Sequence, residues 1–166
     1  MDALVPFFFF CQALGASIGA FLAVWSEIAY VRALQDGHID HAERAHLDVL
    51  AKGLRFGMTL LLLASLGLVV AAYVLDAAVQ PALSAGYWMS IALSLLIICA
   101  TWALSHHRVS FSFGSAIVFT AWWFLAYLTV GLLPALSFGS AVALLVVTTA
   151  IFYAVLHYGR FLALRK

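Results

Sequence analysis

The stretch "FGMTLLLLASLGLVVAAYVL", residues 56–75, determines what kind of fold this chain adopts. It contains no charged side chain, and leucine, valine and alanine make up most of it. About 20 apolar residues in an α-helix are needed to cross the hydrocarbon core of a bilayer. The stretch therefore predicts a helix that spans a membrane.

Similar apolar runs lie on both sides of this stretch. They are separated by helix-ending or charged residues: Asp76 and Pro81, His106–Arg108, and Pro134 with Gly139. The chain is 66% hydrophobic and 9% charged, whereas soluble domains carry about 25% charged residues. We expect an all-α integral membrane protein, a bundle of five transmembrane helices forming a single domain over residues 1–166. The expected spans are 3–30, 56–75, 87–105, 111–133 and 140–158, with residues 31–55 forming a cytoplasmic helical hairpin.

Positive charge gathers on one side of these spans. If the spans alternate in direction, the loop after the first, the loop after the third and the C-terminal tail share a side. Those segments hold all eight basic residues: Arg32, Arg44, Lys52, Arg55, Arg108, Arg160, Arg165 and Lys166. The positive-inside rule makes that side cytoplasmic, with the N-terminus outside and the C-terminus inside. We expect a multi-pass protein of a bacterial-type inner (plasma) membrane, with any polar site on the cytoplasmic face.

The polar segment "QDGHIDHAERAHLD", residues 35–48, separates the first two spans. Asp36-Gly37 is typical of a helix end, and Asp40 followed by Glu43 has the spacing of a capping box. These features predict a solvated turn between two helices. Histidine and aspartate also suit transition metals, so the same segment contains a candidate metal site. Its candidate ligands are His38, Asp40, His41 and His46.

A short part of this segment resembles a known family. "ERAHLDVL", Glu43–Leu50, is similar to the Arg-Ala-His-x-Asn-x-x-Glu stretch of the membrane-associated eicosanoid and glutathione metabolism (MAPEG) proteins. The resemblance implies an outside N-terminus and a glutathione site facing the cytoplasm. Asp48 stands in place of the asparagine and Ala51 in place of the glutamate. The family has four spans, whereas five are expected here.

Glu27 lies near the inner end of the first span. An ionisable side chain inside a membrane helix is a candidate functional group, and a partner of opposite charge is expected for it. An antiparallel hairpin would bring Lys52 or Arg55 of the second span within reach. Two interpretations remain open, an ion pair that holds the hairpin together and a carboxylate that binds a proton or cation. The second predicts a transport or binding protein with a hydrated cavity reaching Glu27 from the cytoplasm.

Histidines end two other spans. His106 and His107 follow the third span, and His157 lies near the end of the fifth, at matched depth on the cytoplasmic side. Two imidazoles from different helices can bind a b-type haem. A haem-binding redox membrane protein is therefore the alternative function. Contact of these histidines with lipid headgroups is the simpler interpretation.

Small residues indicate where helices pack closely. Gly15 and Gly19 form one GxxxG pattern and Gly53 and Gly57 another, and such patterns bring helix backbones together in lipid. They serve packing within the chain or a homo-oligomer equally well. A structural or assembly subunit of a membrane complex is thus a third class. A net charge of +1 without a basic cluster gives no indication of nucleic-acid binding. The residues contain no catalytic motif, and the sequence leaves open whether the protein is an enzyme.

Overall fold

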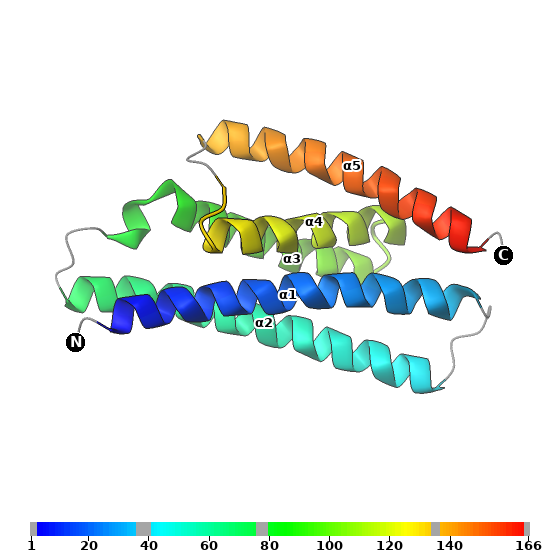
Figure 1. The fold of residues 1–166 in the computed structure, drawn as a ribbon, viewed down its shortest axis with the longest axis horizontal. Coiled ribbons are helices and arrows are strands. Elements are labelled where there is room, and N and C mark those ends of the chain that lie inside the picture. Colours follow the sequence, from blue (N-terminus) through cyan, green and yellow to red (C-terminus); the bar gives the residue numbers. More distant parts are fainter. Residues whose placement is uncertain (1–2, 36–40, 76–79, 134–136, 165–166) are drawn as a thin grey trace.

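The computed structural model describes residues 3–35, 41–75, 80–133 and 137–164. Within these ranges the regular structure is helical, which confirms the predicted all-α class. Five helices are long and apolar enough to cross a membrane. In chain order the elements are α1 (Leu4–Gln35), α2 (His41–Val74), the short 3-10 helix η1 (Pro81–Leu83), α3 (Ala85–Ser105), α4 (Phe111–Thr129) and α5 (Phe138–Leu164) (Figure 1).

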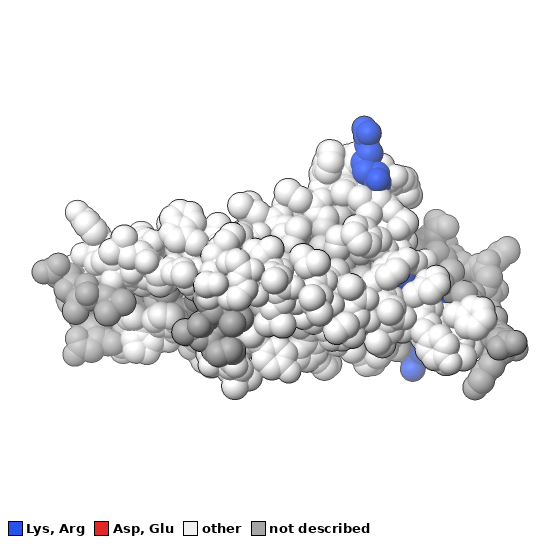
Figure 2. All heavy atoms as spheres, turned by 90° about the horizontal axis from the view of Figure 1, so that it is seen from above, with Lys and Arg blue, Asp and Glu red and all other residues white. Residues whose placement is uncertain are grey.

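The helices lie lengthwise beside one another and alternate in direction (Figure 1). The start of α1, the end of α2, the start of α3, the end of α4 and the start of α5 share one end of the bundle. The end of α1, the start of α2, the end of α3, the start of α4 and the end of α5 share the other. We call this second end the basic end. The described lysines and arginines belong to the parts of the helices and connections near it, namely Arg32, Lys52, Arg55, Arg108 and Arg160. Basic side chains visible in Figure 2 lie toward the same end.

Helix α4 ends earlier than the sequence predicts, at Thr129 rather than near residue 133. The cause is local. Gly131 adopts a left-handed conformation with φ of 76°. Its N–H donates to the carbonyl of Leu128, and the N–H of Leu132 donates to that of Tyr127. This Schellman arrangement closes the helix before the apolar residues run out.

Helices α1 and α2 pack through close backbone contact. A Cβ added to Gly15 would lie 2.8 Å from the carbonyl oxygen of Gly57, and one added to Gly57 would lie 3.0 Å from that of Gly15. Only glycine permits this approach. The two GxxxG patterns thus serve packing within the chain. They also set the rotation of α1 about its axis, and hence the direction of every other side chain on it.

The buried core lies mainly among α1–α4, with Ala141 of α5 at its edge, and includes Leu61, Leu93, Trp122 and Leu125. Helix α5 lies against α1 and α4 at the edge of the bundle (Figure 1). Among its described side chains only Ala141 and Arg160 are buried. A buried arginine on the least buried helix points to a specific partner.

Candidate functional site

Glu27 of α1 and Arg160 of α5 form a buried ion pair near the basic end of the bundle. At 1.5 Å per residue, each lies roughly 33–35 Å from the far end of its own helix. The two side chains therefore match in depth although 133 residues separate them in sequence. Arg160 is 7% exposed and Glu27 is 8% exposed. Isolated charges at this level of burial are costly, so each needs the other.

One nitrogen of Arg160 carries the hydrogen bonds of this site. Nη2 donates to Oε1 of Glu27 at 2.8 Å and to Oε2 at 2.6 Å. It also donates to Oγ of Ser115, on α4, at 2.7 Å. Ser115 donates its own proton to the carbonyl of Ser112, which leaves a hydroxyl lone pair for the arginine. Because Nη2 has two N–H groups and three acceptors, one N–H is shared. The site thus joins α1, α4 and α5.

Two aromatic rings contact the guanidinium as well. Its Cζ lies 5.5 Å from the ring centroid of Tyr30 and 5.3 Å from that of Phe111. The two rings are stacked with centroids 4.0 Å apart. Nε and Nη1 of Arg160 are buried and have no hydrogen-bond partner in the described part of the chain. Cation–π attraction from the rings compensates part of that loss and gives Arg160 a second set of partners besides Glu27.

A groove beside the ion pair lies between parts of α1 and α5. It has a volume of about 510 Å³. Glu27 and Arg32 line it on the α1 side, and Gly159 and Arg160 on the α5 side, with aliphatic residues between. The groove leaves room for water-sized molecules beside the Glu27 side chain. It is a candidate route by which a small ion or proton reaches Glu27.

The predicted partner of Glu27 was wrong. Lys52 and Arg55 are exposed, and neither forms an ion pair with Glu27. The reason is the rotation of α1. Leu22 faces α2, where a Cβ on Gly53 would lie 2.6 Å from it. Glu27 comes five residues later and is turned by about 140° from that face, toward α5 instead.

From the sequence, Arg160 is counted only among the basic residues of the expected cytoplasmic side, and its pairing with Glu27 is missed. Depth was a signal available in the sequence, but it was not sufficient. Counted from the helix ends opposite the basic end, Glu27 lies 23 residues along α1 and Arg160 lies 22 residues along α5, but Lys52 also lies 22 residues from the end of α2. Equal depth along two helices does not show whether two side chains face each other.

The histidines of the polar segment do not form a cluster in the described residues. Trp25 donates its indole N–H to Nε2 of His46 at 3.0 Å, which ties α1 to α2. His41 is exposed. His38 and Asp40 lie outside the described residues. No group of three potential metal ligands occurs in the ranges that the structure describes. Helix α1 ends at Gln35 and α2 begins at His41, and the predicted turn at residues 36–40 lies outside the described residues.

The three candidate haem ligands belong to the C-terminal cap of α3, the α3–α4 connection and α5, near the basic end, and the ring contacts of His106 and His157 are local. His106 packs on Trp102, with ring centroids 4.5 Å apart, and its Nδ1 lies 2.9 Å from the Trp102 carbonyl oxygen. His157 stacks on Tyr153 at 6.0 Å. His107 adopts a positive φ of 54° in the α3–α4 connection. Neither His106 nor His107 shares a ring contact with His157 among the described side chains.

Comparisons with protein-family models, with curated proteins and with solved structures found no match to this chain. The short resemblance at Glu43–Leu50 gains no support from them. The ion pair and its surroundings therefore carry the functional interpretation.

Proposed function

We propose that this is a small multi-pass membrane protein that binds a proton or cation at Glu27 and couples that binding to transport. The observation that carries the proposal is the buried Glu27–Arg160 pair at the edge of the α1–α5 groove. An intramembrane carboxylate with an exchangeable partner is a common element of ion and proton pathways. Arg160 takes the counter-charge role that the sequence had suggested for Arg55.

The proposed orientation follows from charge. The described lysines and arginines gather at the basic end, and the positive-inside rule makes that end cytoplasmic. The N-terminus is then outside and the C-terminus inside, in a bacterial-type inner membrane. In this orientation Glu27 lies near the cytoplasmic edge of the hydrocarbon core, where ions from the cytoplasm enter first.

The proposed mechanism is an exchange of partners. A proton or cation that occupies Glu27 competes with Arg160 for the same two carboxylate oxygens. Once displaced, Arg160 keeps its bond to Ser115 and its contacts with the rings of Tyr30 and Phe111. These contacts would hold the guanidinium of Arg160 in place while a proton or cation occupies Glu27. This second set of partners distinguishes the site from a simple structural salt bridge.

Helix α5 is the element that such an exchange would move. Apart from Arg160, Ala141 is its only described side chain that is buried. A helix held by few buried contacts needs little free energy to shift. Loss of the Glu27 bond would loosen the cytoplasmic end of α5 and widen the groove between it and α1.

Proton flux into proteoliposomes tests the proposal. An imposed potassium diffusion potential drives protons inward, and a trapped pH dye reports their entry. We expect flux with the unaltered protein, loss of flux with Glu27→Gln, and unchanged flux with Arg55→Gln as the matched control. The same series is repeated with sodium as the driven ion. Flux that persists at the original rate in a folded Glu27→Gln variant would show that the pair is only structural.

A structural or assembly subunit is the second candidate, favoured by the exposed surface of α5. Large apolar side chains such as Val146, Ile151 and Phe161 are more than half exposed on that helix. Lipid covers them in a monomer, and a second copy or another membrane subunit covers them in a complex. Cysteine crosslinking at Val146 in native membranes separates the two cases, because a protein that acts alone gives no specific crosslinked partner.

A further inference from the structure

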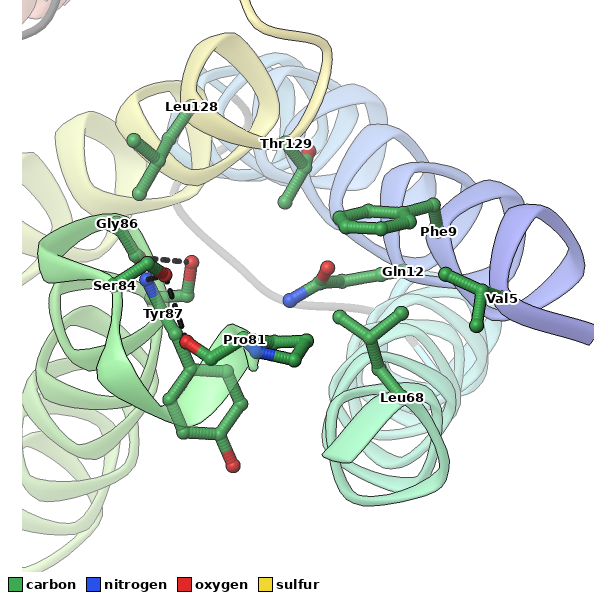
Figure 3. A pocket seen from close by; sticks show the side chains of 11 residues that line it. Val5, Phe9, Gln12, Leu68, Pro81, Ser84, Gly86, Tyr87, Leu128 and Thr129 are labelled. Atoms are coloured by element: carbon green, nitrogen blue, oxygen red, sulfur yellow. Dashed lines mark hydrogen bonds between the residues drawn. The ribbon is translucent and has the colours of Figure 1, made fainter. Parts of the chain in front are cut away.

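A second pocket lies at the opposite end of the bundle from the ion pair, where α1, α2, η1, α3 and α4 meet (Figure 3). Its volume is about 480 Å³, within the range of roughly 300–1,000 Å³ typical of small-molecule sites. Phe9, Leu68, Pro81 and Leu128 form apolar walls. Among the described residues that line it, none is acidic or basic. The pocket therefore suits a neutral and largely apolar molecule.

Gln12 projects into this pocket from α1 (Figure 3). It is 6% exposed, and its Nε2 donates to Oγ of Ser65 at 2.9 Å. Ser65 in turn donates to the carbonyl of Leu61 at 2.7 Å, so its hydroxyl can only accept from Gln12. This requirement fixes which way the amide faces. Oε1 of Gln12 accepts no hydrogen bond from the described residues, and the side chain that carries it lines the pocket.

The other polar groups of the pocket also present acceptors. Ser84, Ser90 and Thr129 each donate their hydroxyl proton to a backbone carbonyl, at 2.8, 3.0 and 2.9 Å. Each hydroxyl oxygen therefore offers a ligand a lone pair that accepts a hydrogen bond, and no proton to donate. The hydroxyl of Tyr87 is turned away from Gln12 (Figure 3). Among the described side chains that line the pocket, the donor left to meet a ligand near Gln12 is the second N–H of its own Nε2.

We propose that this pocket binds a neutral amphiphile whose head group carries hydroxyl donors, of the monoacylglycerol or long-chain alcohol class. A hydroxyl of the ligand would donate to Oε1 of Gln12 and could accept from the second Nε2 hydrogen. The apolar tail would lie along Phe9, Leu68 and Leu128. This ligand class follows from the acceptors on the pocket's side chains and the lack of charge, and it is independent of the function proposed for Glu27.

Equilibrium binding of radiolabelled monoolein to the purified full-length protein in dodecyl maltoside tests the proposal. The competitors are methyl oleate, which has the same tail but no hydroxyl, and oleate, which is charged. We expect monoolein to compete at least about tenfold better than methyl oleate, because one hydrogen bond near 1.4 kcal/mol corresponds to that factor. Gln12→Leu keeps the side-chain volume close to that of glutamine and should abolish this preference.

Two valine variants provide a matched pair. Thr129→Val removes a hydroxyl that lines the pocket, whereas Thr120→Val removes an equally back-bonded hydroxyl on the same helix outside it. We expect weaker monoolein binding only for Thr129→Val, and this comparison stands even if Gln12→Leu fails to fold. Equal competition by monoolein and methyl oleate, or equal binding by both valine variants, would overturn the proposal and identify the pocket as an unspecific seat for acyl chains.

Discussion

Gly19 of α1 lies directly against the indole ring of Trp122 on α4. A Cβ added to Gly19 would stand 2.1 Å from Cε3 of that ring, and Trp122 is only 1% exposed. The largest side chain of the core therefore occupies the space that the missing side chain of Gly19 leaves free. A Cβ on Gly15 would point at α2, whereas a Cβ on Gly19 would point at α4, although the backbone of Gly19 also lies near Gly57 of α2.

This contact predicts a large effect from one methyl group. We expect Gly19→Ala to lower the free energy of unfolding by about 1–3 kcal/mol, because the ring must move out of a packed core. Thermal unfolding in detergent micelles measures the change. Gly139→Ala is the control, since a Cβ there meets nothing within 4 Å. A Gly19→Ala variant as stable as the Gly139→Ala variant would contradict the packing described here.

The ion pair predicts strong coupling between its members. Removing one partner of a buried pair leaves an uncompensated charge, at a cost of about 3–5 kcal/mol. We expect that loss for Arg160→Met alone, and recovery of most of it when Glu27→Gln is added. Unfolding of the two single variants and the double variant measures the coupling. Strictly additive losses would mean that the two charges do not stabilise each other.

His107 predicts a stabilising substitution. It is the left-handed residue that closes α3, with its N–H donating to Leu104 and the N–H of Arg108 donating to Ala103. Glycine adopts this conformation without the clash of a Cβ. We expect His107→Gly to raise stability by at most about 1 kcal/mol, because the freer unfolded chain offsets part of the gain.

The same variant examines the haem hypothesis. Visible spectra before and after hemin addition are compared for the unaltered protein and His107→Gly. A Soret band that disappears with the substitution would assign His107 as an axial ligand. Higher stability with an unchanged spectrum would assign it a purely conformational role. His106→Gly is the matched control for stability, because His106 has a negative φ of −97° and gains nothing from glycine.

The bond from Trp25 to His46 predicts a modest link between α1 and α2. Both side chains are exposed, so the hydrogen bond is expected to contribute about 0.5–1.5 kcal/mol. A double-mutant cycle with Trp25→Phe and His46→Phe measures the interaction energy directly. We expect the two losses to be less than additive by that amount. A coupling near zero would show that the bond is not maintained in solution.

The number of long helices, their approximate ends and the gathering of basic residues at one end could all be predicted from the sequence. These properties are local. Helix length follows from counting apolar residues against a fixed bilayer thickness, and alternation of direction sorts the charges. Even the error at α4 was local, because Gly131 closes that helix through a single left-handed residue.

The partner of Glu27 and the setting of Gln12 depended on the tertiary structure. These helices are apolar on nearly all sides, so their periodicity does not say which face meets which neighbour. Backbone contact between Gly15 and Gly57 sets the rotation of α1. That rotation turns Glu27 away from Arg55 and toward Arg160. A rotation fixed by contact between distant segments cannot be recovered from one helix at a time, and it determines which charges and amides can meet.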